Sequence, residues 1–156
     1  MTTRDPDCPL CQSEGGTLLW QGPQLRVIEV DDPDYPGFTR VVWNAHLPEM
    51  TSLSHHGRDL LMRAVYAVEQ AQRDTLHPDK VNLASLGNMV PHLHWHIIPR
   101  WREDRHFPNA VWAAPSFGAG AEPPAFLARR EALAQRLPRY RNRLVETMDN
   151  WLLGAG

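Results

Sequence analysis

Residues 90–100, VPHLHWHIIPR, constrain the possible fold more strongly than any other segment of the sequence. Histidine occupies every second position, at His92, His94 and His96, and large apolar residues fill the positions between them. Successive side chains of a β-strand point to opposite faces, so residues two apart share one face at a spacing of about 6.5 Å. The pattern therefore predicts a strand that presents three imidazoles on one face and packs its other face into the core.

Short runs rich in β-branched and aromatic residues predict the other strands of a sheet. They occupy residues 17–20, 25–30, 38–44 and 80–86. From Ser54 to His77, apolar residues recur every three or four positions, which predicts an amphipathic helix. Ser54 is expected to cap this helix, and Pro78 follows its end. Five strands and one long helix give an α+β fold.

A second helix is expected to open at Pro123 and Pro124 and to end at Pro138, because proline lacks the amide hydrogen of a helix interior. The expected organisation is one domain at residues 1–118, followed by a helical C-terminal extension at 119–156 that is not an independent domain. The extension is basic, and its arginines are expected to form a solvated helical face rather than a phosphate-binding patch: Arg136, Arg139, Arg141 and Arg143.

The composition of the 156 residues excludes some classes of partner. A formal net charge of −2 gives no electrostatic reason to expect binding to nucleic acid or to a membrane. No apolar run approaches the roughly 20 residues that cross a bilayer. The N-terminus lacks the apolar segment of a signal peptide, so a cytoplasmic location is expected. In that compartment Cys8 and Cys11 predict a metal-binding or redox pair rather than a structural disulfide.

Three histidines on one strand face are compatible with two kinds of chemistry. Imidazoles at i and i+2 can converge on one metal ion, as strand-borne ligands of catalytic zinc sites do. Alternatively, one imidazole serves as a nucleophile or base while its neighbours orient it and stabilise charge. Neutral imidazole, with a pKa of about 6.5, is abundant near pH 7 and is a good nucleophile towards phosphorus. The spacing alone does not separate these two interpretations.

The segment LGNMVPHLHWHIIPRW resembles the signature of the histidine triad (HIT) family of nucleotide hydrolases and transferases. Its alternating histidines and apolar residues match that signature, and the likeness extends over roughly residues 8–112. The chain is most similar to a bacterial branch described as diadenosine tetraphosphate hydrolase-like. The resemblance implies a meandering antiparallel sheet with one long helix, a homodimer and a nucleotide substrate, with no catalytic cofactor.

The resemblance also implies separate roles for residues of the motif. His94 would attack the α-phosphorus of a dinucleoside polyphosphate or a nucleoside phosphoramidate, with its second ring nitrogen held by a backbone carbonyl. His96 would donate to phosphate oxygens as charge develops there, and His92 is the third catalytic member. Four further residues are expected to contact the substrate: Gly87, Asn88, Asp31 and Arg100. Trp112 is expected to contribute to packing.

Some members of the family are similar in a further respect, because an N-terminal Cys-x-x-Cys joins two histidines. The matching positions here are His46, where the third strand ends, and His92. The resemblance therefore implies a closed structural zinc site of Cys8, Cys11, His46 and His92, with no position open for water. A thiol pair without a metal is the alternative interpretation.

Three positions depart from the family pattern. Phe38 stands where the family commonly has a histidine, Asn88 replaces a glutamine, and Met89 replaces a serine or threonine. These differences leave two other functions open. One is a nucleotide-binding or regulatory module without catalysis, and the other is an enzyme whose metal lies on the three triad histidines.

Overall fold

The computed structural model describes residues 3–153, which form a five-stranded antiparallel sheet with two long helices. The strands follow the order β1-β2-β3-β5-β4 across the sheet. Their bounds are β1 Thr17–Gln21, β2 Leu25–Glu29, β3 Thr39–Trp43, β4 Lys80–Ala84 and β5 His94–Arg100. This arrangement confirms the α+β fold that the sequence predicts, although the histidine strand begins at His94 and not at His92.

The first long helix, α2 (His55–Thr75), begins where the sequence predicts. The Ser54 hydroxyl accepts a hydrogen bond from the Gly57 amide at 3.1 Å and so satisfies one of the free amides of the first turn. The periodic apolar residues of this helix are fully buried: Leu61, Ala64, Val65, Val68 and Ala71. Two short helices were not predicted: α1 (Pro9–Gln12) and η1 (Met50–Ser52).

The second long helix, α3 (Pro124–Met148), contradicts the predicted helix end at Pro138, because it continues through that residue. An interior proline removes one helical hydrogen bond and costs about 3 kcal/mol or more. On either side of it, however, Leu133, Tyr140 and Leu144 are almost completely buried. Burial of each large apolar side chain contributes about 1.5–3 kcal/mol, which offsets the local cost. A π-helical turn, η2 (Asp149–Leu153), follows α3.

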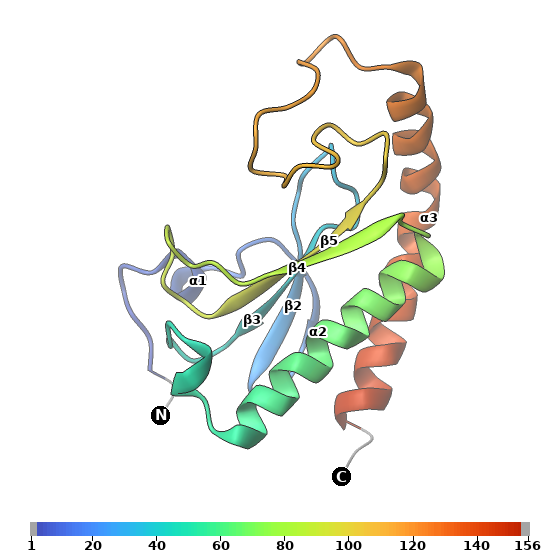
Figure 1. Cartoon of the computed structure of the whole chain (residues 1–156). Coiled ribbons are helices and arrows are strands. Elements are labelled where there is room, and N and C mark those ends of the chain that lie inside the picture. Colours follow the sequence, from blue (N-terminus) through green and yellow to red (C-terminus); the bar gives the residue numbers. More distant parts are fainter. Residues whose placement is uncertain (1–2, 154–156) are drawn as a thin grey trace.

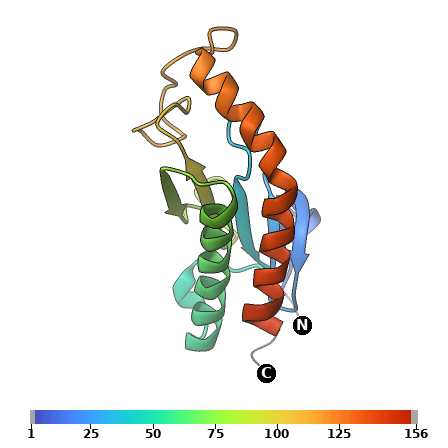
Figure 2. The same cartoon turned by 90° about the vertical axis from the view of Figure 1, so that its right-hand side faces the viewer.

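Both long helices cover the same face of the sheet (Figure 1). α2 packs against β3 and β5, whereas α3 packs against α2 and β1. The view turned by 90° shows the two helices side by side in one layer (Figure 2). The main apolar core lies between this layer and the sheet, where Val27, Val41 and Ile97 meet the helices. The opposite face of the sheet is therefore available to α1 and to loops.

Polar contacts attach α3 to the other elements. Arg141 forms a bidentate ion pair with Glu29 of β2 at 2.8 and 2.9 Å. Arg143 pairs with Asp74 of α2 at 3.3 Å. Two of the arginines predicted to form a solvated helical face are therefore engaged in ion pairs with other elements. Within residues 3–153, neither these helices nor any other helix has the length and apolar character that spanning a membrane requires.

Candidate functional site

The register of β5 places His94 and His96 on the sheet face that the long helices leave uncovered. On the neighbouring strand β3, Val42 lies opposite His94 and Arg40 lies opposite His96. Ile97, the residue after His96, points the other way and is fully buried in the main core. The strict alternation of the sequence thus separates the polar face of β5 from its packed face.

A cavity of about 620 Å³ opens over these two histidines. Its wall combines α1, β3, β5, Trp112 and the loop between β4 and β5, which carries the predicted contacts Gly87 and Asn88. Gly87 has a φ of 82°, in the left-handed region that favours glycine. The Ser85 hydroxyl donates to the His94 carbonyl at 3.0 Å and ties this loop to the strand. The volume is typical of a site for a small organic ligand.

His94 is held by the backbone of its own strand. Its Nδ1 lies 2.5 Å from the carbonyl oxygen of His92. A carbonyl only accepts hydrogen bonds, so the imidazole donates from Nδ1 and carries its lone pair on Nε2. Burial lowers the pKa of His94, which favours the neutral ring near pH 7. This is the arrangement that a nucleophilic imidazole needs.

His96 lies beside His94, with 4.8 Å between the ring centroids. Burial, together with the neighbouring His94 and Arg40, lowers the pKa of His96 to about 3. Arg40 donates from Nε to His96 Nδ1 at 3.3 Å. Two aromatic rings also approach this imidazole: Phe38 at 5.8 Å and Trp112 at 5.4 Å between centroids. His96 is therefore a neutral, closely packed group at the edge of the cavity.

The four residues predicted to bind zinc come together from three separate segments. The ligand atoms of Cys8, Cys11, His46 and His92 all lie within 4.8 Å of one another. Both Cys8 Sγ and Cys11 Sγ lie 3.5 Å from His92 Nδ1, and Cys11 Sγ lies 3.5 Å from His46 Nδ1. Ligands at zinc-bonding distance in a tetrahedron lie roughly 3.3–3.8 Å apart. The four residues could therefore hold a metal ion.

Neighbouring groups orient this cluster. His92 donates from Nε2 to the Trp43 carbonyl at 2.6 Å, so its Nδ1 carries the lone pair and faces the two sulfurs. The Asp5 amide donates to Cys11 Sγ at 3.5 Å, and the Asp5 carboxylate lies 3.7 Å from His46 Nε2. Such outer contacts fix ligand tautomers and orientations in metal sites. The helix α1 supplies the turn that brings both cysteines to one point.

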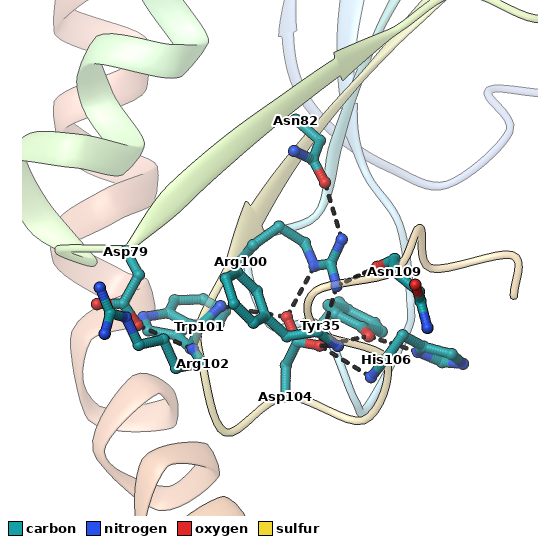
Figure 3. A network of polar contacts seen from close by, with 10 residues as sticks. Tyr35, Asp79, Asn82, Arg100, Trp101, Arg102, Asp104, His106 and Asn109 are labelled. Atoms are coloured by element: carbon teal, nitrogen blue, oxygen red, sulfur yellow. Dashed lines mark hydrogen bonds and ion pairs between the residues drawn. The ribbon is translucent and has the colours of Figure 1, made fainter. Parts of the chain in front are cut away.

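The predicted substrate contact Arg100 lies in a separate buried network (Figure 3). Its side chain is only 2% exposed and forms a bidentate pair with Asp104 at 2.7 and 3.1 Å. It also donates to the Asn82 side chain and to the Asn109 carbonyl. Although burial alone would raise the pKa of Asp104, hydrogen bonds from Arg100 and the His106 amide hold it below its usual value. The structure does not bring Arg100 to the cavity, and we leave it out of the site.

Asp31, the other predicted substrate contact, does not reach the histidines either. It is exposed in the turn between β2 and β3 and lines a different cavity together with Glu29 and Arg141. Arg141 of α3 also pairs with Glu29 at the end of β2, so this cavity lies between the turn and that helix. Of the four predicted substrate contacts, only Gly87 and Asn88 lie in the cavity wall.

Among the wall residues that were not predicted as site residues, Trp112 and Arg40 both contact His96. Trp112, expected to pack, is 54% exposed and lies edge-on to His96. Arg40 lies within a predicted strand but had no predicted role in the site. The alternation of Phe38, Arg40 and Val42 shows that these three share a face. The sequence does not show that this face meets the histidines, since that depends on which strands pair.

Comparison with family models matches residues 15–103 to the HIT domain. Among solved structures, the chain is similar to a histidine triad protein from Bradyrhizobium japonicum. The two are 28% identical, with a TM-score of 0.61 and coverage of 80% of this chain and 92% of that chain. A histidine triad (HIT) protein from Sinorhizobium meliloti 1021 is 23% identical, with a TM-score of 0.60 and coverage of 80% and 91%.

A third structure, described as a hypothetical histidine triad nucleotide-binding protein from Sulfolobus tokodaii strain 7, is 21% identical. Its TM-score is 0.56, and the match covers 88% of each chain. These two structures below 25% identity support the fold alone. A comparison with curated proteins gives no match.

Proposed function

The chain belongs to the HIT family, and on this premise we propose that it is a nucleotide hydrolase that acts through His94. The observation that carries the proposal is the hydrogen bond between His94 Nδ1 and the His92 carbonyl, because it leaves the lone pair on Nε2. The mostly apolar lining and few polar groups of the cavity fit a phosphorylated nucleoside. The diadenosine tetraphosphate hydrolase-like branch stays a prediction, and a nucleoside phosphoramidate is an equal candidate substrate.

In the proposed reaction, His94 Nε2 forms a bond to the α-phosphorus while the bond from phosphorus to the leaving oxygen or nitrogen breaks. Water then attacks the nucleotidyl-imidazole and releases a nucleoside monophosphate. Over the whole cycle one water molecule is consumed: its hydroxyl stays on phosphorus and its hydrogen goes to the leaving group. His96 donates to a phosphate oxygen as negative charge develops there.

A catalytic metal on the three triad histidines has less support. His92 Nδ1 faces the two cysteines, and His92 Nε2 is engaged by a backbone carbonyl. His94 Nδ1 is likewise engaged. A metal ion shared by the triad would have to displace the contacts of His92, although Nε2 of His94 would be available to it. Brief treatment with a chelator separates the two mechanisms, because only the metal mechanism predicts an immediate loss of turnover in folded protein.

We also propose that Cys8, Cys11, His46 and His92 hold a structural zinc ion. Their mutual distances and the orientation of the His92 ring support this assignment. Zinc bound there would cross-link the N-terminal segment to the ends of β3 and β5. The reaction itself needs no cofactor, since all its proposed steps use side chains of the cavity.

The proposed reaction is tested by trapping the intermediate. Purified protein is mixed with a mass-tagged dinucleoside polyphosphate or nucleoside phosphoramidate, denatured rapidly and digested for mass spectrometry. We expect a nucleotide on the peptide that contains His94, and no adduct in His94→Asn. Asparagine keeps a donor for the His92 carbonyl but has no nucleophile. The matched control is His55→Asn, at an exposed position in the first turn of α2.

Turnover without an adduct, or turnover that survives in His94→Asn, contradicts the proposed mechanism. A different result defines the alternative function: binding of adenosine monophosphate without adduct or turnover indicates a nucleotide-binding module. In that case Phe38 is the first position to test, because it lies next to His96 and replaces a histidine that is common in the family.

The homodimer and the cytoplasmic location belong to the same proposal. β4 is an edge strand, so its outer backbone groups have no strand partner within residues 3–153. Edge strands are common places for one chain to pair with another. Light scattering at micromolar concentration measures the mass directly. A mass equal to that of one chain at this concentration contradicts the dimer.

A further inference from the structure

Arg40 is a charged residue in the cavity wall that the proposed reaction does not yet use. It lies on β3 opposite His96, and its side chain is partly buried. Burial lowers the pKa of Arg40, which indicates that water solvates this charge less than usual. None of the ion pairs found in residues 3–153 includes Arg40.

The deeply buried arginines of the described chain are different, because each has a carboxylate partner. The pairs are Arg26 with Glu14, Arg100 with Asp104, and Arg105 with Asp34 and Glu122. A poorly solvated cation without a carboxylate destabilises the unliganded protein. Such a cost to stability is typical of a functional site. Here it indicates that the missing anion comes from a ligand.

The contact between Arg40 and His96 fixes a tautomer. A guanidinium has no acceptor, so the hydrogen bond from Arg40 Nε requires a lone pair on His96 Nδ1. Neutral His96 then carries its proton on Nε2. His94 is the reverse, with its proton on Nδ1 and its lone pair on Nε2. Two imidazoles side by side therefore offer one acceptor and one donor nitrogen for a ligand.

The other donors of Arg40 are available to a ligand. Within the part of the chain that the structure describes, its two terminal amino groups make no hydrogen bond. Arg40 lines the cavity together with His94 and His96, while the Phe38 ring lies 5.7 Å from its guanidinium carbon. A guanidinium fork matches two oxygens of a phosphate.

We propose that Arg40 holds His96 in the Nε2-protonated tautomer and binds the nucleotide phosphate through its terminal amino groups. Arg40 is thus a positioning residue for His96 and a direct contact for the anion. The phosphate contact rests on the proposed function of the cavity. The tautomer, by contrast, is a property of the unliganded protein and is measured without any substrate.

The experiment compares the full chain with Arg40→Met and Arg40→Lys, and with Arg73→Met as a matched control at an exposed position of α2. ¹⁵N NMR of histidine-labelled protein reports which ring nitrogen carries the proton, and His96 is assigned from a His96→Gln spectrum. Calorimetry then measures binding of adenosine monophosphate. Methionine has similar length but neither donors nor charge, whereas lysine keeps a charge with N–H donors but lacks the Nε donor and the planar fork of the guanidinium.

In Arg40→Met we expect a mixed His96 tautomer, about 10- to 100-fold weaker binding, and a Tm no lower than that of the parent. Arg40→Lys restores part of the affinity but not the single tautomer. An unchanged tautomer, unchanged affinity or an unfolded Arg40→Met variant overturns the proposal. If the parent chain binds no adenosine monophosphate, the phosphate contact fails together with the proposed function, and the NMR spectra still decide the positioning role.

Discussion

His92 and His94 lie two residues apart, yet their imidazoles are prepared for different chemistry. His92 donates to a backbone carbonyl from Nε2, which leaves Nδ1 facing the sulfurs of Cys8 and Cys11. His94 donates to a backbone carbonyl from Nδ1, which leaves Nε2 for the cavity. The comparison teaches that the backbone contact decides which nitrogen is available. The groups that face that nitrogen, two sulfurs at His92 and the cavity at His94, then decide which chemistry it suits.

The two sites are also joined by His92. Its side chain belongs to the cluster of Cys8, Cys11, His46 and His92, hereafter the metal-ligand cluster, while its carbonyl oxygen accepts the hydrogen bond that orients His94. A cross-link at the cluster would therefore restrain the carbonyl that orients His94, the proposed nucleophile. Four predictions separate the two sites or measure their connection, beginning with the largest expected effect.

The first prediction is that His94→Asn removes turnover and leaves the metal-ligand cluster intact. We expect a loss of 10³-fold or more in kcat, roughly 4 kcal/mol of transition-state stabilisation. Zinc content by elemental analysis and Tm by calorimetry should match those of the parent. A His94→Asn variant that loses zinc would show that the two sites are not separable.

The second prediction is that Cys11→Ser lowers the stability of the fold, because Cys11 is a proposed zinc ligand and not a proposed catalytic residue. Loss of a bound ion present at a thousandfold excess over its Kd removes about 4 kcal/mol of stability. Chelation of the parent should lower Tm in the same way, and added zinc should reverse the effect only in the parent. Protein that contains substoichiometric metal and keeps its Tm contradicts the zinc assignment.

The third prediction concerns pH and the cavity histidine His96, whose pKa of about 3 lies below the usual 6.5. Below pH 6.5 the unfolded chain binds a proton at this histidine that the folded chain does not bind. Above that pH, His96 does not reduce the free energy of unfolding. As the pH decreases towards 3, protonation of the unfolded chain lowers that free energy. Between pH 7 and 5 we expect a loss of up to about 2 kcal/mol, measured by urea unfolding.

His96→Gln should reduce this pH dependence, whereas the exposed His55→Gln should retain it in full. His92 and His94 contribute in the same direction, because burial lowers the pKa of both. An identical pH profile in parent and His96→Gln contradicts the prediction.

The smallest predicted effect belongs to Trp112, which lies edge-on to His96. Trp112→Leu should weaken binding of adenosine monophosphate by less than about tenfold, since one aromatic contact contributes about 0.5–1.5 kcal/mol. Its Tm and zinc content should not change, and Trp151→Leu serves as the matched control. A marked fall in Tm would instead support the packing role that the sequence suggested.

Local patterns predicted most of the fold. Alternation identified β5, and runs of β-branched and aromatic residues identified the other strands. The three- to four-residue period identified α2 with its Ser54 cap. The rule for proline failed at Pro138, because distant side chains bury the apolar face of α3 on both sides of it. The position of Arg100 soon after the triad suggested a substrate contact. In the structure its side chain is paired with Asp104 in a buried network, which the local sequence pattern does not reveal.

The sequence by itself determined the alternation of β5, and so which histidines share a face. It also placed the cysteines three residues apart, and the resemblance to the HIT family identified His46 and His92 as their partners. Only the tertiary structure decided which nitrogen of each imidazole is available, because that depends on carbonyl groups of Trp43 and His92. The pairing of β3 with β5 likewise placed Arg40 opposite His96, a contact between residues 56 positions apart. Side-chain period is local, whereas strand pairing and hydrogen-bond partners are set by the packed chain.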